Sequence, residues 1–550
     1  MVLLGVQLIV TLLTISIMQK VTQRFSFGKW ILCQTGLVYY LHPTDAELRK
    51  LAGIPQPKPK PKPKEGDNKR GKHKRKRAEE PVEDKTFTVP RNIELQLETA
   101  KIFPKDVLQL KFFTEFVWLV DYSVFVLVVY IITEIYCGVF PKGNQEVNLS
   151  MLWCLLLIGF ALKSLCSVTS LYFWNTEAAA ERSLVLVGGS FCFVLALGLL
   201  LIDESNLEIG LDAAYSAFNA SASEFLEQQT MDSEGPASKL ILKLCFAVWC
   251  GITGALFIFP GLRVSRMHLD ALRYCSERKV LKIFMYINLV SPFLLSLLWI
   301  RPLARHYFSV RVFGDMEAPL MNEQTFDSMR LWLCVVFSLV RIVSAPSCFQ
   351  AYLNLAQEKI EIMKKEAGRI SNVDLQRKIA IIFYYLCVVG LQFVAPVILC
   401  VGFTLMNKTM GGYGWFGQHH YNPDECIPQQ EPKATISNLL PNDEATLGDA
   451  REQWLVALSS FRQIFSYEVF RGVFGFANWW MQFLSFFTIG CGLAYQSYFE
   501  EQTNGAVLHN FGDVQILAIQ SSPMSSAVGW MHMQHKSHSS SDWMMTIMDL

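Results

Sequence analysis

Long apolar stretches separated by polar loops dominate the pattern of this chain. A helix rises ~1.5 Å per residue and needs ~20 apolar residues to cross ~30 Å of hydrocarbon. Nine stretches approach that length: residues 1–18, 116–138, 149–173, 183–202, 240–262, 281–300, 327–348, 379–406 and 472–495. The pattern therefore predicts an all-α fold, a polytopic transmembrane helical bundle with about nine membrane helices.

The polar segments divide the chain into four parts. We expect a first membrane helix over residues 1–18, a basic loop over 19–115, the transmembrane bundle over 116–500 and a disordered tail over 501–550. Within the loop, residues 55–81 are rich in Lys and Pro, which keep a chain extended and self-repelling, so this tract is predicted to be disordered. No basic region precedes the first stretch, which favours an uncleaved helix over the alternative, a cleaved signal peptide.

The distribution of positive charge predicts the orientation of the helices. Lys and Arg near membrane ends resist translocation, which places the 19–115 loop in the cytoplasm. If the helices are counted forward, the basic loops around residues 263–279 and 359–378 fall on the same side, and the acidic loop 203–238 falls on the outer side. Three N-x-Ser/Thr sequons share that outer side and are predicted glycosylation sites: Asn219, Asn407 and Asn148.

Composition and motifs narrow the class of protein. Hydrophobic residues make up 51% of the chain and charged residues 18%, which suits a membrane protein better than a soluble one. The basic tract lies beside membrane helices, so its expected partners are membrane lipids and not nucleic acid. The chain has no phosphate-binding, zinc-protease or nucleophile-elbow motif and no C-x-x-C pair. We therefore expect no enzyme activity, no cofactor and no metal site.

Ionisable residues inside the predicted spans are the first functional candidates. A charge at mid-bilayer costs ~3 kcal/mol or more, so it normally faces protein or water. Asp121 lies ~8 Å and Lys163 ~15 Å from the cytoplasmic face, so the two are predicted to pair, either as a structural ion pair or as part of a proton or cation relay. Arg341 has no acidic residue near it in its own span, where Asp327 lies 14 residues away, and must find a carboxylate, a carbonyl or a lipid phosphate elsewhere.

Two predicted helices share a second polar feature, an amide side chain four residues before a proline. Asn288 lies four residues before Pro292, and Gln392 lies four residues before Pro396. Proline removes the hydrogen bond to the carbonyl four residues back, so each kink frees a backbone oxygen beside an amide side chain. Such helices either line an ion or substrate path or are repaired by a neighbouring helix, and the sequence leaves both interpretations open.

Residues 349–368 carry an apolar stripe at helical spacing with lysines on the other faces. The pattern predicts an amphipathic cytoplasmic helix. Such a helix lies on anionic lipid, binds a partner such as calmodulin, or packs beneath the bundle.

Several long strings in this chain resemble the transmembrane protein 161 family of multi-pass membrane proteins. The strings are LVYYLHPTDAELRKLAG from Leu37, WLVDY from Trp118, WCLLLIGFALK ending at Lys163, FPGLRVSRMHLDAL from Phe259, FDSMRLWL from Phe326, QAYLNLAQEKIEIMKKEAGRIS from Gln350 and FYYLCVVGLQFVAP from Phe383. The resemblance extends to about Tyr495. The Lys-Pro tract looks expanded relative to the family, and the last ~50 residues look unlike its usual end.

The resemblance implies a glycosylated membrane protein that modulates potassium and calcium currents and cell excitability and protects against oxidative stress. The leading hypothesis is thus a non-enzymatic regulator of ion currents in the plasma membrane or the endomembrane system, with ion channels or other membrane proteins as partners. The alternative is an ion or solute transporter or channel that uses Asp121, Lys163, Asn288 and Gln392. The sequence leaves the oligomeric state open.

Overall fold

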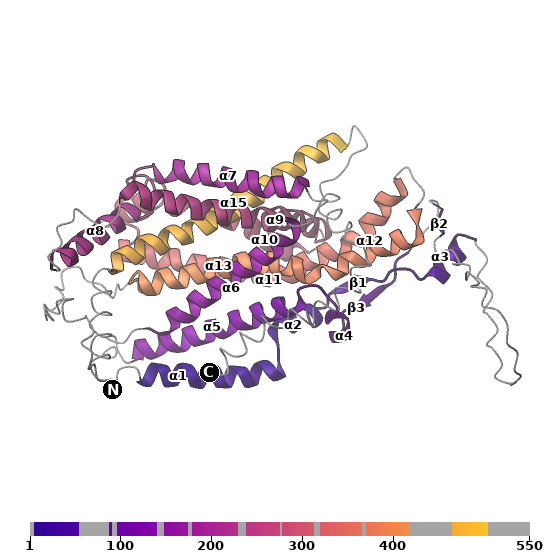
Figure 1. Cartoon of the computed structure of the whole chain (residues 1–550), viewed down its shortest axis with the longest axis horizontal. Helices are drawn as coiled ribbons and strands as arrows, with labels where there is room; N and C mark the ends of the chain where they lie inside the picture. The colour runs from indigo at the N-terminus through magenta and orange to yellow at the C-terminus, as the bar shows by residue number, and fades with distance from the viewer. Residues whose placement is uncertain are drawn as a thin grey trace, which may run out of the picture.

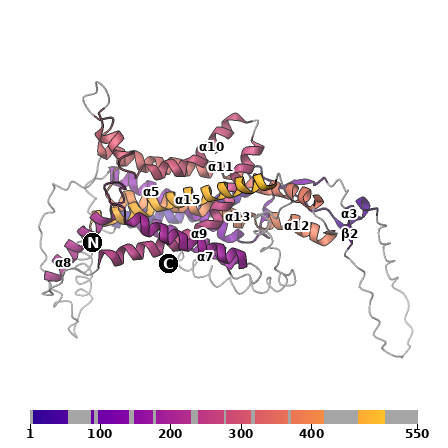
Figure 2. The same ribbon diagram turned by 90° about the horizontal axis from the view of Figure 1, so that it is seen from above.

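The protein is a bundle of long helices that lie side by side (Figures 1 and 2). The computed structural model describes residues 5–53, 87–90, 96–139, 148–173, 179–228, 238–275, 278–312, 319–365, 370–416 and 465–503. The long helices are α1 (Gly5–Arg24), α5 (Phe113–Val139), α6 (Ser150–Phe173), α7 (Ala179–Leu200), α9 (Lys239–Tyr274), α10 (Lys279–Leu297), α11 (Glu323–Lys365), α13 (Leu386–Met410) and α15 (Tyr467–Thr503). The predicted Lys/Pro tract falls within residues 54–86, outside the described residues, as does the tail from residue 504 onward.

Helices long and apolar enough to cross a membrane confirm the predicted all-α polytopic architecture. Seven such helices occur among the described residues: Phe113–Val139, Ser150–Phe173, Glu181–Leu200, Lys239–Tyr274, Lys279–Leu297, Glu323–Lys364 and Asn372–Met410. Helices α1 and α15 occupy the first and last of the nine predicted stretches but are not among the seven. The predicted number of nine is therefore not confirmed.

Helix α13 is the central helix of the bundle. It contacts α5, α6, α9, α11 and α15, and its residues from Leu386 to Lys408 are all buried. A helix that is apolar all round belongs in the interior. The outer helices instead expose large apolar side chains, among them Val187 and Val194 on α7 and Ile283 on α10. Such exposure suits a surface covered by lipid.

The predicted amphipathic helix over 349–368 is not a separate element. Helix α11 runs without a break from Glu323 to Lys365, so the predicted boundary at residue 349 is wrong. Pro346 lies inside the helix just before that position but does not end it. The apolar stripe, including Phe349, Leu353 and Met363, is buried within the same chain. Helix α11 contacts α9, α12 (Asn372–Tyr384) and β1 (Val38–Tyr40). Packing beneath the bundle is therefore the alternative that the structure supports.

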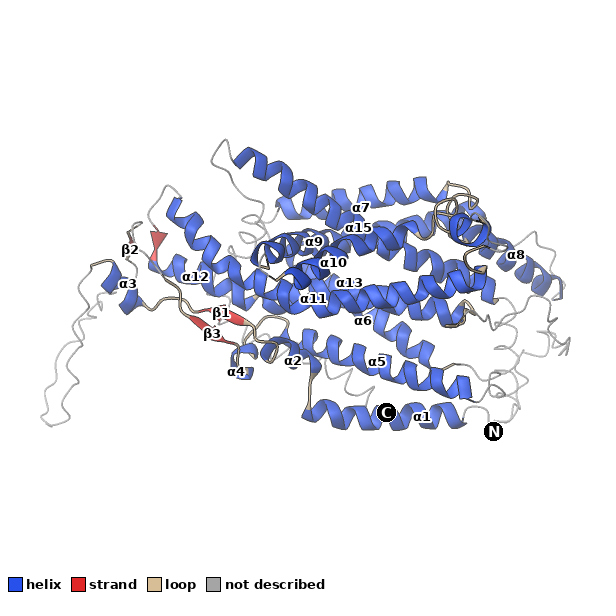
Figure 3. Ribbon diagram, turned by 180° about the vertical axis from the view of Figure 1, so that it is seen from behind, coloured by secondary structure: helices blue, strands red, loops and turns tan. Residues whose placement is uncertain are grey.

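The segment predicted as a basic loop forms short elements at one end of the bundle. They are α2 (Phe27–Cys33), β1 (Val38–Tyr40), α3 (Asp45–Leu51), β2 (Thr88–Val89), β3 (Thr99–Lys101) and α4 (Pro104–Val107). Strand β1 pairs antiparallel with β3, and β2 pairs antiparallel with β4 (Ile370–Ser371), which leads into α12 (Asn372–Tyr384). Figure 3 shows these strands together at the end of the bundle near α12 and α3.

A single side chain holds two distant parts of this end together. Asn372 is fully buried, and its Nδ2 donates a hydrogen bond to Asp45 Oδ1 at 2.9 Å. Its Oδ1 accepts a hydrogen bond from the backbone N–H of Phe87 at 3.0 Å. The side chain thereby connects α3 to the approach of β2.

The opposite end carries α8 (Leu211–Gln228), as Figure 1 shows. A π-helical turn, η2 (His306–Val310), lies near the start of α8, where Arg305 forms an ion pair with Glu208. Helix α8 packs on α15, where the backbones approach closely. A Cβ atom added to Gly472 of α15 would lie 2.3 Å from the carbonyl oxygen of Gly210 and 2.5 Å from Cβ of Ala214. Only glycine allows this contact.

Candidate functional site

The structure separates the five predicted polar candidates into two groups. Arg341, Asn288 and Gln392 are buried inside the bundle, at 6%, 1% and 1% exposure. Asp121 is also buried but lies against the N-terminal segment, and Lys163 is exposed. The buried group therefore defines the candidate site.

The predicted pairing of Asp121 with Lys163 is wrong. Asp121 accepts hydrogen bonds from Ser26 Oγ at 2.7 Å and from the backbone N–H of Gly28 at 2.9 Å. It thereby holds the start of α2 against α5, which is a structural role. Lys163 points outward from α6, and no carboxylate among the described residues forms an ion pair with it. Matching depth placed the two residues at similar levels but said nothing about the direction in which each side chain points.

A different ion pair ties α5 to the central helix. Glu134 of α5 pairs with Lys408 at the end of α13, and Tyr130 bonds with Thr409 at 3.0 Å. The sequence analysis missed this pair because Lys408 lies just beyond the predicted span. The sequence did contain an indication of this pair, since both residues lie near the C-terminal ends of their helices.

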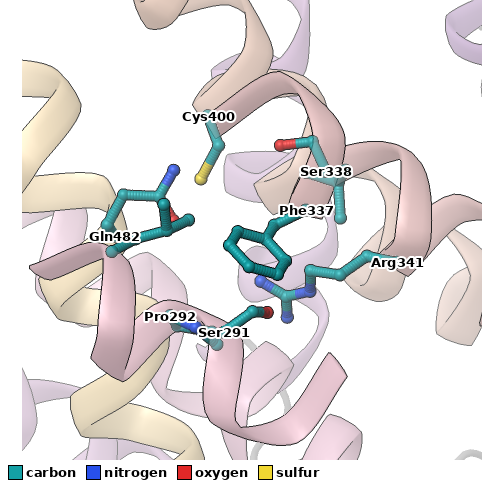
Figure 4. Close-up of a pocket in the computed structure, with 9 residues that line it drawn as sticks. Ser291, Pro292, Phe337, Ser338, Arg341, Cys400 and Gln482 are labelled. Atoms are coloured by element: carbon teal, nitrogen blue, oxygen red, sulfur yellow. The ribbon is translucent and has the colours of Figure 1, made fainter. Parts of the chain in front are cut away.

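Arg341 lies beside a small internal cavity between α10, α11, α13 and α15. Its lining includes Ser291 and Pro292 of α10, Phe337, Ser338 and Arg341 of α11, Val397 and Cys400 of α13, and Gln482 of α15. Figure 4 shows the Arg341 guanidinium and the Gln482 amide reaching toward this space from opposite sides. The cavity volume is about 10 Å³, which is the size of a site for one water molecule. We call this space and its lining the Arg341 chamber.

Nitrogen atoms without hydrogen-bond partners are concentrated near the Arg341 chamber. Arg341 Nε and Gln482 Nε2 are buried and have no partner among the described residues. The same is true of Asn478 Nδ2, one helical turn from Gln482 on α15. Buried polar groups are normally bonded, so these three unpartnered donors are unusual. Asn288 Oδ1 of α10 is an unpartnered acceptor in the same part of the bundle, but Asn288 does not line the chamber.

The proline kink at Asn288 is repaired from within its own helix. Pro292 cannot donate to the carbonyl oxygen of Asn288, and the hydroxyl of Ser291 donates to that oxygen at 3.0 Å instead. The Asn288 Nδ2 donates to Ser344 Oγ of α11. Asn288 thus connects α10 to α11 at Ser344, which lies three residues after Arg341.

Gln392 belongs to a second buried group on the other side of the central helix. Its Nε2 donates to the hydroxyl of Tyr172 at 3.4 Å, and that hydroxyl also accepts from Arg263 at 3.2 Å. Gln392 Oε1 has no partner among the residues described. No hydrogen bond between described residues joins Gln392 to Asn288, so the polar path predicted from the two prolines is not continuous through them.

A network of ion pairs at the end of the bundle near η2 was not predicted. Arg305 donates to Glu208 and to Asp327, both at 2.6 Å, and Arg330 donates to Asp327 at 3.1 Å. Burial lowers the pKa of Arg305, but Asp327 and Glu208 outweigh that effect and raise it above its usual value. Glu208 and Arg305 lie just outside the predicted spans, so the search for intramembrane charges passed over them.

The three predicted sequons lie at helix ends or in a helix on the same side of the bundle. Asn148 caps α6 by accepting from the N–H of Ser150 at 3.0 Å, Asn219 is half-buried in α8, and Asn407 is 2% exposed at the end of α13. An oligosaccharide needs an accessible amide, so burial of Asn407 weighs against that site. Glycosylation of all three remains a prediction.

We expect Asn219→Gln to remove a glycan and Asn407→Gln to have no effect. The physical reason is the difference in exposure of the two side chains. The measurement is the shift in gel mobility of the full-length protein on treatment with an endoglycosidase. A shift that is retained in the Asn219 variant and lost in the Asn407 variant would contradict the folded position of Asn407.

Comparison with known families decides the identity of this fold. The model of the family described as predicted transmembrane protein 161AB matches residues 2–500. The chain belongs to this family. It is therefore a multi-pass membrane protein, and the match spans the described bundle from α1 to nearly the end of α15. No solved structure matches the chain.

Proposed function

We propose that this member of the transmembrane protein 161AB family is a non-enzymatic membrane protein that modulates potassium and calcium currents, and through them cell excitability, with a role in protection against oxidative stress. The Arg341 chamber is the observation that supports this most. A charged side chain that is buried in the membrane costs energy, and such residues usually serve ion movement or its control. The resemblance described above supplies the kind of current.

The proposed regulation does not run through the surface that the sequence suggested. The apolar stripe of residues 349–363 is buried against the chain itself, so it is not free to bind calmodulin or a channel. Exposed positions of the same segment, such as Gln357 and Glu361, are polar. A partner channel would therefore meet polar side chains at this end or the lipid-facing side of the bundle.

Transport by the chain itself is the second candidate function. The residues that the sequence predicted for transport must be revised, because Asp121 has a structural role and Lys163 is exposed. Arg341 and Gln482 replace them as polar groups at the centre of the bundle. Asn288 stays in the set because it bonds to the helix that carries Arg341.

Two measurements on the full-length protein distinguish these functions. Ion currents are recorded in cells that express it, and ion flux is recorded in liposomes that contain the purified protein. Regulation predicts altered currents in cells and no flux in liposomes, whereas flux in liposomes would establish transport.

The variant Arg341→Met tests whether the Arg341 chamber is involved. We expect it to abolish the effect on currents, because it removes the buried charge and keeps a side chain of similar length. Lys163→Met is the matched control, since it removes an exposed charge at a comparable depth, and its currents should equal those of the unmodified protein. If the currents with Arg341→Met also equal those with the unmodified protein, the Arg341 chamber is ruled out as the basis of the function.

A further inference from the structure

We propose that the Arg341 chamber is a binding site for a small monovalent inorganic anion of the halide type, such as chloride. This inference goes beyond the proposed function, because binding can be measured whether or not the protein changes any current. It depends on three features of the described residues: the charge balance around Arg341, the chemistry of the unpartnered groups, and the size of the cavity.

No carboxylate in the described part of the chain balances the charge of Arg341. Arg305 and Arg330 share Asp327 and Glu208, and Lys408 pairs with Glu134. Arg341 is only 6% exposed. Nevertheless, no carboxylate among the described residues lies within ion-pair distance of it. Arginine keeps its proton inside proteins, so the positive charge cannot be removed by deprotonation. A bound anion would supply the missing negative charge.

The unpartnered groups of the Arg341 chamber are hydrogen-bond donors. Arg341 Nε and Gln482 Nε2 both line it, and each lacks an acceptor among the described residues. A halide ion accepts hydrogen bonds and donates none, so it matches both groups at once. Water also accepts hydrogen bonds, but it carries no charge and would leave the guanidinium uncompensated.

A hydroxyl group of the lining can adjust to such an ion. Ser291 and Ser338 now donate to backbone oxygens of their own helices, those of Asn288 and Cys334, at 3.0 and 2.7 Å. Hydroxyl hydrogens rotate freely about the C–O bond. Ser338 can therefore turn its proton toward an anion without any movement of the helices, whereas the Ser291 proton is needed by the Asn288 carbonyl that Pro292 leaves without a backbone donor.

Cavity size selects among anions. A volume of about 10 Å³ suits an occupant of the size of a water molecule and is too small for phosphate, sulfate or an organic acid. The remaining lining is apolar, with Pro292, Leu295, Phe337 and Val397. A weakly hydrated monovalent ion loses less on leaving water for such surroundings than a strongly hydrated multivalent one.

Binding is tested on purified full-length protein in detergent. Radioactive chloride should bind and should be displaced by bromide but not by gluconate, which is too large for the cavity. At constant ionic strength, exchange of gluconate for chloride should raise the melting temperature, because a ligand that binds only the folded state stabilises it. Absence of both chloride binding and halide-dependent stabilisation in the unmodified protein would overturn the proposal.

Variants then assign the binding to this place. Arg341→Gln and Gln482→Leu should each weaken chloride binding about tenfold or more, the loss expected when a charge-assisted hydrogen bond or a buried donor is removed. Arg301→Gln, which changes an exposed arginine, is the matched control and should bind as the unmodified protein does. If Arg341→Gln fails to fold, Gln482→Leu alone tests the assignment. Unchanged chloride affinity in a folded variant of either residue would place the anion elsewhere and overturn the assignment.

Discussion

Replacing Asp327 by asparagine is expected to lower the free energy of unfolding by about 3–5 kcal/mol. Asp327 is 7% exposed and accepts hydrogen bonds from Arg305 and Arg330, at 2.6 and 3.1 Å. Arg330 is 4% exposed and also lies over the ring of Trp299, 4.6 Å from its centroid. Removal of one carboxylate would leave a buried guanidinium without its nearest negative charge, which costs more than the ion pair itself contributes.

The neighbouring change Glu323→Gln is the matched control for Asp327→Asn. Glu323 also contacts Arg305, at 3.5 Å, but its side chain is 64% exposed, so water screens the interaction. Exposed ion pairs contribute at most about 1 kcal/mol. Thermal unfolding of both purified variants in detergent measures the difference. Equal destabilisation by the two changes would show that burial does not govern this network.

Gly472→Ala is expected to destabilise the protein by about 1–3 kcal/mol, the usual cost of an added group in a packed interface. The new Cβ would meet the backbone oxygen of Gly210, which cannot turn aside as a flexible side chain can. Helix α8 would have to move away from α15. The backbone at Gly210 has a φ of +76°, a conformation that glycine adopts more readily than other residues, so the contact depends on two glycines.

Gly490→Ala, on the same helix, separates this contact from the general effect of the substitution. No atom lies within 4 Å of a Cβ added at Gly490. Alanine is the better helix former by roughly 0.5–1 kcal/mol, so this control should be neutral or slightly stabilising. Opposite signs for the two variants in thermal unfolding support the close α8–α15 contact. The same sign and size would contradict it.

The sequence was sufficient to predict the long apolar helices because the interior of a membrane leaves the backbone no other choice. Unpaired backbone groups are too costly in hydrocarbon, so long apolar runs become helices wherever they occur. The end of a helix is less constrained, which is why α11 continues past residue 349 although the pattern there changes from apolar to amphipathic. Its apolar stripe is buried by β1 and α12, elements that the sequence analysis had left inside a loop or a span.

Side-chain partners were harder to predict than helices, for a geometric reason. Depth in the membrane follows from counting residues, but pairing also requires that two side chains point toward each other. The buried positions of α6, such as Ala161, Leu165 and Val168, form one stripe, and Lys163 lies off it. That spacing was readable in the sequence and argued against a pair with Asp121. Nothing in the sequence placed Gln482 of α15 and Arg341 of α11 around one cavity, because that cavity depends on how distant helices are arranged.

The hydrogen bonds of Asn372 imply that the length of the Lys-Pro tract has little effect on the bundle. Asp45 precedes residues 54–86 and Phe87 follows them, and both are fastened to this one buried amide. Insertions between the two attachment points therefore enlarge a closed loop without displacing any helix. Loop closure costs only about 0.6 kcal/mol for each doubling of length, so repeats of Lys and Pro can accumulate there at almost no thermodynamic cost.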